Sequence, residues 1–238
     1  MTPSAPDPAL VDKLVLANRI LHHQGIVDSF GHVSVRHDKT AGHFLLARNM
    51  APALVRSEDI VTFDLDGGAL DAAGRRVYLE RFIHGEIYRA RPDVQAIVHS
   101  HSPSVIPFGV TGQALRPVFH MSGFLGEGTA LFEIRNVAGD TDMLVSNGSL
   151  GVALAAALGS RSAVLMRGHG STVVGASLEQ AVYRAFYAEV NARLQIQAMG
   201  LGEVSYLNAQ EAAKAAAIND TQLTRVWELW RQEIGTID

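Results

Sequence analysis

The sequence of 238 residues contains no cysteine. Disulfide bonds, thiolate metal ligands and cysteine nucleophiles are therefore excluded, and any bound metal must be held by histidine and carboxylate side chains. A concentration of positive charge is also missing, since the net charge is −4 and the lysines and arginines are scattered along the chain. This distribution argues against a nucleic-acid partner.

Long apolar runs are missing as well. No stretch reaches the roughly 18 to 20 residues of a membrane span, and the polar, proline-rich residues 1–8 have none of the basic and apolar segments of a secretion signal. We therefore expect a cytoplasmic protein without a membrane partner, whose residues 1–8 form a flexible tail. Residues 9–238, in a chain that is 47% hydrophobic and 18% charged, are expected to form one α/β domain.

Two histidines at the end of a hydrophobic segment are the most informative feature. Residues 94–98 are mostly apolar and predict a buried strand, in which side chains two apart share a face, so His99 and His101 should lie side by side. Two imidazoles so placed form half of a metal site, and Glu80 and His169 can supply the remaining ligands. The alternative is a chance meeting of two histidines at a strand end, but such a polar end is poorly suited to a core.

Apolar periodicity and turn residues predict the order of helices and strands. Helices are expected over residues 8–23, 80–91, 103–110, 149–158 and 177–199, and again after residue 209. Strands are expected within 29–37 and over 43–47, 60–65, 94–102, 116–119, 143–146 and 163–166. Glu80 would lie in the first turn of a helix that leads into the histidine strand, and the glycines on both sides of His169 would expose it at a strand end.

Four short motifs, in this order along the chain, resemble the class II aldolase and adducin family: Gly31-His32-Val33-Ser34, Glu80 with His84, His99-Ser100-His101, and Gly168-His169-Gly170. The resemblance implies a three-layer α/β/α fold with a central, mostly antiparallel sheet, and a homotetramer. It further implies that His99, His101 and His169 bind a metal ion and that Glu80 is a fourth ligand or an acid/base residue.

Two departures from the sugar-phosphate aldolases of that family bear on the substrate. Those enzymes bind the substrate phosphate with an asparagine in a Gly-Asn-x-Ser loop and with a pair of serines just before the acidic residue. Here His32 takes the place of the asparagine, and Tyr78 and Leu79 take the places of the serines. A phosphate needs several hydrogen-bond donors and a leucine side chain has none, so a phosphorylated sugar is disfavoured.

The segments 30–34, 44–50 and 78–84 instead resemble a decarboxylase branch of the family, which acts on hydroxylated aromatic carboxylates such as dihydroxyphthalate or hydroxypyridine-dicarboxylate. The leading hypothesis is therefore metal-dependent, non-oxidative decarboxylation of a small aromatic acid. Mn²⁺ is the preferred ion, with Zn²⁺, Fe²⁺ and Co²⁺ as alternatives, because a set of three histidines and a carboxylate accepts all four. Glu80 is the preferred proton donor and His32 is its competitor.

Further candidate residues follow from the expected diacid substrate. Arg48 or Arg81 would bind a second carboxylate, with Asn49 as a neutral partner, because a guanidinium pairs with a carboxylate through two parallel hydrogen bonds. Either arginine could equally be a solvated surface charge. The family resemblance also implies that His120 and Tyr206 reach a site at a subunit boundary.

Three other functions compete with the leading hypothesis. A class II aldolase acting on an unphosphorylated substrate would share the metal and Glu80. An iron(II)-dependent oxygenase of the hydroxyphenylpyruvate type would use the same ligands. An adducin-like binding protein is disfavoured, because that type is expected to have lost the metal histidines, whereas His99, His101 and His169 are all present.

Overall fold

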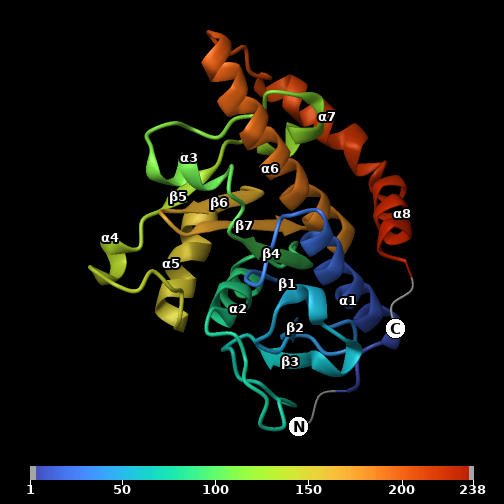
Figure 1. The fold of residues 1–238 in the computed structure, drawn as a ribbon. Coiled ribbons are helices and arrows are strands. Elements are labelled where there is room, and N and C mark those ends of the chain that lie inside the picture. The colour runs from blue at the N-terminus through green and yellow to red at the C-terminus, as the bar shows by residue number, and fades with distance from the viewer. Residues whose placement is uncertain (1–3, 236–238) are drawn as a thin grey trace.

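A seven-stranded sheet forms the centre of the computed structural model, which describes residues 4–235 (Figure 1). The strands are β1 (His32–Arg36), β2 (His43–Ala47), β3 (Ile60–Asp64), β4 (Ala96–Ser100), β5 (Ala130–Phe132), β6 (Ala163–Met166) and β7 (Gly170–Gly175). Their order across the sheet is β3-β2-β1-β4-β7-β6-β5, and neighbouring strands are antiparallel except for β5 and β6. The predicted mostly antiparallel sheet is confirmed.

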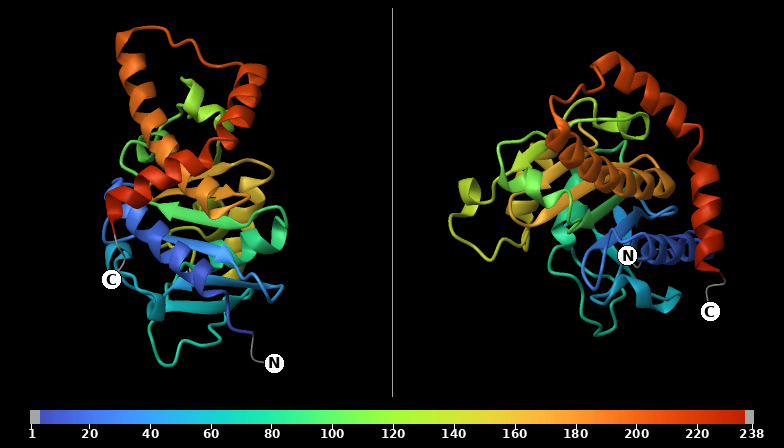
Figure 2. Two further views of the ribbon diagram at one scale, coloured as in Figure 1. Left: turned by 90° about the vertical axis from the view of Figure 1, so that its right-hand side faces the viewer. Right: turned by 45° about the horizontal axis from the view of Figure 1, so that its top comes forward.

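Helices cover both faces of this sheet (Figure 1 and Figure 2). The α-helices are α1 (Pro8–His23), α2 (Arg81–Ala90), α3 (Ile106–Val110), α4 (Arg135–Ala138), α5 (Gly148–Leu158), α6 (Leu178–Leu201), α7 (Ala209–Asp220) and α8 (Leu223–Ile234). Short 3-10 helices are η1 (Pro52–Leu54), η2 (Ser57–Asp59) and η3 (His120–Leu125). One face packs against α2 and α5 and the other against α1, α6 and α8, which gives the predicted three layers. Within residues 4–235 no helix has the length and apolar character needed to cross a membrane.

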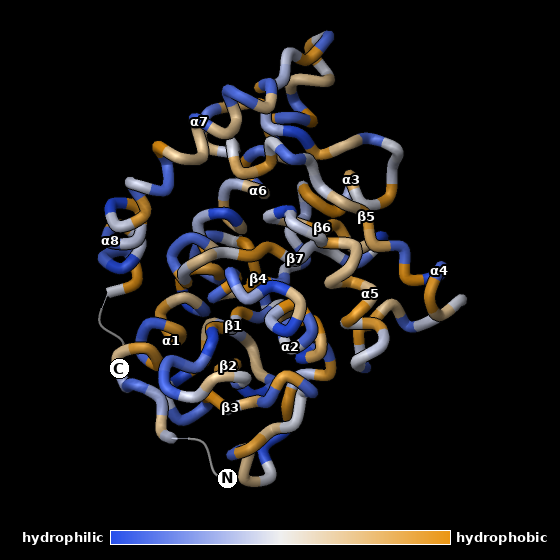
Figure 3. The backbone as a smooth tube through the Cα atoms, turned by 180° about the vertical axis from the view of Figure 1, so that it is seen from behind, coloured by the Kyte–Doolittle hydropathy of each residue, from blue (hydrophilic) through white to orange (hydrophobic). Residues whose placement is uncertain are grey.

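Alternating side chains of the strands supply both hydrophobic cores. In β2, Phe44 and Leu46 belong to the core beneath α2 and α5, whereas Leu45 belongs to the core beneath α1, α6 and α8. Successive strand residues point to opposite faces, so one short strand serves two layers. The outer helices α7 and α8 alternate between hydrophilic and hydrophobic residues (Figure 3), and α8 docks through its buried Trp227 and Trp230.

Residues 116–119 are not a strand, so the prediction for them is wrong. Two buried amide side chains of α6 bind this segment: Asn191 Oδ1 accepts from the Val118 N–H, and Gln195 Oε1 accepts from the Arg116 N–H, both at 2.9 Å. Asn191 Nδ2 also donates to the Arg116 carbonyl at 2.8 Å. Because side chains satisfy these backbone groups, the segment needs no neighbouring strand.

Residues 143–146 are not a strand either, and two strands occur that the pattern did not predict. The side chain of Asp142 accepts from the Leu144 N–H at 3.1 Å. The backbone of this segment therefore also pairs with a side chain and not with a neighbouring strand. Strand β5 has only three residues, too few to show a period of two. Strand β7 begins and ends with glycine, which usually signals a turn, and the β-branched residues between them pair with both β4 and β6.

The first described residues contact the loop between β1 and β2. The Asp7 side chain accepts from the Ala9 N–H at 3.0 Å and so caps α1, which begins at Pro8. Lys39 Nζ donates to the Ala5 carbonyl at 3.0 Å. Residues 1–3 of the predicted tail lie outside the described residues.

Replacement of Gly170 by alanine should destabilise the protein. A Cβ at Gly170 would clash with the carbonyl oxygen of Ser100 on β4, whereas a Cβ at Gly112 would meet open space. Overpacking of this kind costs about 1–3 kcal/mol. We therefore expect Gly170→Ala to lower the midpoint of thermal unfolding and Gly112→Ala to leave it unchanged or slightly raised. Equal midpoints for the two variants would contradict the close approach of β7 to β4.

Candidate metal centre

Four potential metal ligands from distant parts of the sequence meet at one end of the sheet. His99 is on β4, with His101 just after the strand, and His169 is in the turn that joins β6 to β7. Strand β7 pairs antiparallel with β4, with His99 opposite Thr172, so the β6–β7 turn lies at the end where β4 finishes. Glu80 enters from the start of α2. The structure thus brings together all four predicted ligands.

The spacing of the four donor atoms fits a metal ion. His99 Nε2 is 3.3 Å from His101 Nε2 and 3.6 Å from Glu80 Oε2, and His169 Nε2 is 3.5 Å from the same Glu80 oxygen. All four ligand atoms lie within 4.8 Å of one another. A tetrahedron with metal–ligand bonds of about 2.1 Å has edges of about 3.4 Å. The donor set and its spacing are therefore those of a His₃-carboxylate centre.

The imidazole lone pairs that a metal needs are made available by hydrogen bonds on the other ring nitrogens. His169 Nδ1 is 3.1 Å from the Met143 carbonyl, which can only accept, so the proton is on Nδ1 and Nε2 faces the other ligands. His99 Nδ1 lies 3.4 Å from Thr172 Oγ1. Burial and the neighbouring histidines hold the pKa of His99 well below its usual range, and burial also lowers the pKa of His101. Unprotonated imidazoles are the form that binds a cation.

The Glu80 side chain points into the cluster and does not cap its own helix. Glu80 is the N-cap residue of α2, just outside the predicted first turn, yet its side chain makes no capping hydrogen bond. Instead Oε1 accepts from the Val145 N–H at 2.9 Å, and Oε2 faces His99 and His169. Burial raises the pKa of this carboxyl, and His169 and the Val145 N–H oppose the rise.

The loop at 143–145 orients two of the ligands through its backbone. The Met143 carbonyl binds His169, and the Val145 N–H binds Glu80. Met143 has a φ of 70°, a left-handed conformation that costs a non-glycine residue of order 1 kcal/mol and is concentrated at functional sites. The sequence offered no signal for this role, because backbone groups of any residue type can perform it.

His32 lies beside the metal cluster but is not one of its four ligands. Its ring centre is 5.0 Å from that of His99, its strand partner across β1 and β4. His32 Nδ1 is 2.7 Å from His84 Nε2, and His84 Nδ1 is 2.6 Å from Ser34 Oγ. Burial and His84 hold the pKa of His32 well below its usual range, and burial lowers the pKa of His84 to about 3.

Tyr78 connects the cluster with the predicted substrate residues Arg48 and Asn49. Its ring centre is 4.7 Å from that of His32, and its hydroxyl donates to the Met50 carbonyl in the loop after Arg48 and Asn49. Burial raises the pKa of Tyr78 to about 12. Arg48 Nε forms an ion pair with Asp59 at 2.6 Å. Sequence reasoning assigned no role to Tyr78 and regarded it only as a replacement for a phosphate-binding serine.

Arg81 has two structural contacts at the start of α2. Its Nε donates to the Gly67 carbonyl at 2.7 Å and its Nη1 to the Tyr78 carbonyl at 2.9 Å. The guanidinium also stacks 4.5 Å from the centre of the Phe82 ring. These contacts occupy part of the donor set that a substrate carboxylate would use.

The chain does not bring His120 and Tyr206 to the cluster. His120 is in η3, and its carbonyl accepts from Asn219 Nδ2 at 2.9 Å. The Tyr206 hydroxyl accepts from Gln195 Nε2 at 3.2 Å, and the guanidinium of Arg116 lies 4.0 Å from its ring centre. Their predicted contact with a site of a neighbouring subunit stays a prediction.

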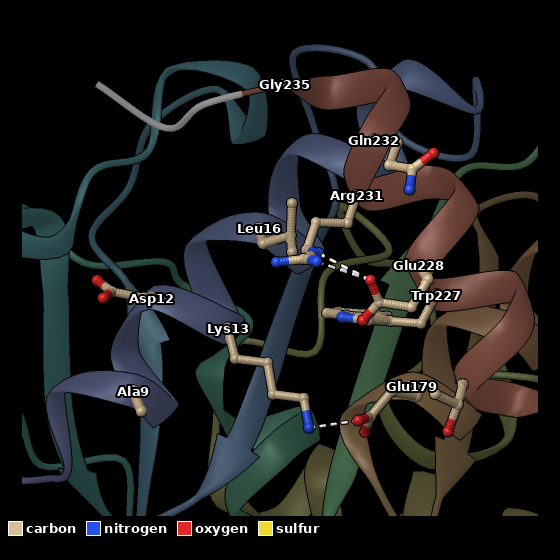
Figure 4. Close-up of a pocket in the computed structure, with 11 residues that line it drawn as sticks. Ala9, Asp12, Lys13, Leu16, Glu179, Trp227, Glu228, Arg231, Gln232 and Gly235 are labelled. Carbon is tan, nitrogen blue, oxygen red and sulfur yellow. Dashed lines mark hydrogen bonds and ion pairs between the residues drawn. The ribbon is translucent and has the colours of Figure 1, made fainter.

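A separate cavity of about 730 Å³ lies between α1 and α8 (Figure 4). Four of its five charged side chains form ion pairs, Lys13 with Glu179 and Arg231 with Glu228, and Asp12 accepts a hydrogen bond from Ser57 Oγ at 3.0 Å. Within residues 4–235 the metal-ligand cluster of Glu80 and the three histidines is not part of its lining. This cavity is therefore separate from the cluster at the sheet end.

The fold and the cluster define an α/β protein with a candidate His₃-carboxylate centre, and comparison with known proteins shows the family to which the chain belongs. Residues 12–196 match the family described as class II aldolase and adducin N-terminal domain. The chain belongs to this family. L-fuculose 1-phosphate aldolase from Glaciozyma antarctica PI12 superposes with a TM-score of 0.78 at 25% identity, covering 98% of this chain and 96% of that one. The predicted fold class is confirmed.

Several relatives are named decarboxylases, and two of them match most of the chain. Decarboxylase tropJ of Talaromyces stipitatus is 36% identical over 241 residues, which cover 91% of this chain and 91% of that protein. The 3,4-dihydroxyphthalate decarboxylase of Arthrobacter keyseri is 32% identical, with 95% of this chain and 93% of that protein covered.

Removal of one ligand should abolish tight metal binding. Loss of an outer-shell partner alone costs about 10–100-fold in affinity, so His169→Ala, which deletes a ligand, should weaken Co²⁺ binding by more than about 100-fold. His43→Ala on β2, whose Nδ1 contacts the Ala41 carbonyl, is the matched control and should bind like the parent. Titration calorimetry and the Co²⁺ absorption spectrum measure the effect. Equal affinities for the two variants would contradict the assigned centre.

Acid should destabilise the protein through His84. Folding lowers the pKa of His84 from about 6.5 to about 3, so below about pH 6.5 the unfolded chain binds a proton that the folded chain does not. The free energy of unfolding should then fall by about 1.4 kcal/mol per pH unit from this group. In chelator-treated protein, the stability advantage of the parent over His84→Gln should narrow from pH 6 to pH 4 in urea unfolding. A constant difference would contradict the buried, neutral His84.

Proposed function

We propose that this protein is a metal-dependent, non-oxidative decarboxylase of a hydroxylated aromatic carboxylate, such as a dihydroxyphthalate or a hydroxypyridine-dicarboxylate. The observation that carries the proposal is the His₃-carboxylate cluster, whose donor atoms lie within 4.8 Å of one another. The names of the relatives from Talaromyces and Arthrobacter agree with the predicted carboxy-lyase class. Mn²⁺ is the proposed ion.

The proposed reaction replaces the carboxylate of an aromatic ring by hydrogen. Direct loss of CO₂ would leave an unstabilised aryl carbanion, so a proton must first add to the ring carbon that bears the carboxylate. The carbon–carbon bond then breaks, its electrons restore the ring, and CO₂ leaves. A divalent ion bound by the three histidines, with Glu80 as a fourth ligand or as the acid/base residue, would act as a Lewis acid for the substrate hydroxyl oxygen and carboxylate.

The protein groups proposed to move the proton are Glu80, which is preferred, and His32. Glu80 has Oε2 among the ligand atoms and is held through Oε1 by the Val145 N–H. His32 approaches from β1, with its ring 5.0 Å from that of His99. Both groups are largely buried, which limits the access of water to them.

Exposed apolar side chains next to the cluster favour an aromatic substrate rather than a sugar phosphate. Phe30 is 66% exposed, and its ring centre is 6.4 Å from that of His101. Leu79, adjacent to Glu80, is 58% exposed. Neither side chain can donate a hydrogen bond to a phosphate, whereas both can pack against a flat apolar ring.

Arg48 and Asn49, or Arg81, are the proposed partners of a second substrate carboxylate. We further propose a cytoplasmic homotetramer in which His120 and Tyr206 approach a neighbouring subunit's site. Apolar side chains exposed at the end of α6, among them Ile196, Met199 and Leu201, support burial against another surface.

Release of CO₂ tests the proposal. Protein reconstituted with Mn²⁺ should convert at least one member of a panel of hydroxylated phthalates, benzoates and pyridine-dicarboxylates to a product lighter by CO₂, as read by mass spectrometry. His99→Ala should lower kcat by at least about 100-fold, and His43→Ala should not. No CO₂ from any member of the panel would refute the proposed function. An aldehyde released from unphosphorylated keto-sugars would favour the aldolase, and oxygen consumption would favour the oxygenase.

A further inference from the structure

A chain of buried hydrogen bonds runs from His32 into the core between β1 and α2. His32 Nδ1 meets His84 Nε2 at 2.7 Å, His84 Nδ1 meets Ser34 Oγ at 2.6 Å, and Ser34 Oγ meets the Tyr88 hydroxyl at 2.8 Å. The chain ends at the Gln95 carbonyl, 3.4 Å from the Tyr88 hydroxyl. His84 and Ser34 are fully buried and Tyr88 is 1% exposed, so water does not interrupt the chain.

The acceptor at the far end sets the direction of every bond in the chain. A carbonyl can only accept, so when the Tyr88 hydroxyl donates to Gln95, its oxygen is free to accept from Ser34. The Ser34 oxygen then accepts from His84 Nδ1, which leaves His84 Nε2 without a proton. His84 Nε2 must therefore accept, and the donor is the N–H of His32 Nδ1.

The reverse direction is less favourable by one hydrogen bond. If Tyr88 donated to Ser34, the Gln95 carbonyl would lose its bond from Tyr88 and keep the one from the Arg36 N–H at 2.9 Å, and the remaining three bonds would all reverse direction. A neutral histidine has one donor nitrogen and one acceptor nitrogen. The two hydrogen bonds of His84 must therefore run in the same direction along the chain. The pKa of His84, lowered to about 3 by burial, supports its neutrality.

We propose that His84, Ser34 and Tyr88 are positioning residues that hold His32 in the tautomer with hydrogen on Nδ1, so that His32 Nε2 offers a hydrogen-bond acceptor to a molecule bound at the metal centre. The ligand that fits an acceptor beside a cation is a hydroxyl group. The assignment of that hydroxyl to the substrate's phenolic group rests on the proposed function, whereas the tautomer does not.

The remaining exposure of His32 is consistent with an outward-facing Nε2. His32 keeps 4% of its surface exposed, whereas its partner His84 keeps none. Within residues 4–235, His32 Nε2 makes no hydrogen bond, yet it is not among the buried side-chain atoms that lack a partner. The atom therefore touches solvent, on a residue whose ring neighbours include the metal ligand His99.

Removal of the Tyr88 hydroxyl should reverse the direction of the hydrogen bonds in this chain. In Tyr88→Phe, Ser34 loses its acceptor, and its hydroxyl can turn to donate to His84 Nδ1. His84 Nε2 must then carry the proton and donate to His32 Nδ1, which shifts the hydrogen of His32 to Nε2. Tyr183→Phe is the matched control, because the buried Tyr183 hydroxyl donates to the Met121 carbonyl at 2.9 Å outside the chain.

Neutron diffraction of the perdeuterated full-length protein locates these hydrogens directly. We expect deuterium on His32 Nδ1 and His84 Nδ1 in the parent and in Tyr183→Phe, and on His32 Nε2 in Tyr88→Phe. Deuterium on His32 Nε2 in the parent would overturn the proposal. So would a Tyr88→Phe protein in which His32 keeps its deuterium on Nδ1.

Steady-state kinetics with an aromatic acid that the enzyme converts test whether His32 Nε2 acts on the substrate. Tyr88→Phe should lower kcat by about 10-fold or more with little change in KM, in the range seen for outer-shell partners, and Tyr183→Phe should change neither. An unchanged kcat in Tyr88→Phe would overturn the role of His32 Nε2 toward the substrate. Absence of turnover in the parent would instead refute the proposed function, while the neutron result would still decide the tautomer.

Discussion

The arrangement at the sheet end depends on holding three imidazole rings and a carboxyl group around one point. Their donor atoms lie within 4.8 Å of one another, and burial keeps the pKa of His99 and His101 below the usual range. Imidazole nitrogens and a carboxylate oxygen this close together are the kinds of donor that bind a cation. The antiparallel pairing of β4 with β7 is what brings the ligands of one strand opposite the turn that carries His169.

Side chains that replace sheet partners recur in this protein. Glu80 binds the Val145 N–H, and Asn191 and Gln195 bind the backbone at Val118 and Arg116. In both places an apolar segment that resembles a strand is held as an irregular loop, because its polar backbone groups already have partners. At 143–145 this arrangement has a chemical consequence, since the same loop fixes the orientation of two metal ligands. At 116–118 it joins α6 to the loop that precedes η3.

The pairing of β1 with β4 joins the metal centre to the interior of the protein. His32 lies opposite His99 in this pair, and its other neighbours are Tyr78 and His84. One side of His32 therefore faces the candidate metal ligand His99, and the other side begins a buried chain of hydrogen bonds that ends in the core. A buried polar chain of this kind is costly when incomplete and rigid when satisfied, which favours a single orientation of the ring. The proposed chemistry would thus rest on a ring whose orientation is set from β1 and α2.

The sequence by itself predicted the candidate metal ligands from local patterns, and its family resemblance predicted the three layers and the mostly antiparallel sheet. His-x-His on a strand, a histidine between glycines and a glutamate before an amphipathic helix are local patterns, and period and spacing reveal them. Only the tertiary structure decided which predicted strands form irregular loops. It also showed that Glu80 is an N-cap residue without a capping bond, and that the backbone of Met143 and Val145 orients His169 and Glu80. It alone joined His32 to His84, Ser34 and Tyr88. The physical reason is that these contacts use backbone groups or pair residues about 50 positions apart, and neither leaves a periodic trace in the chain.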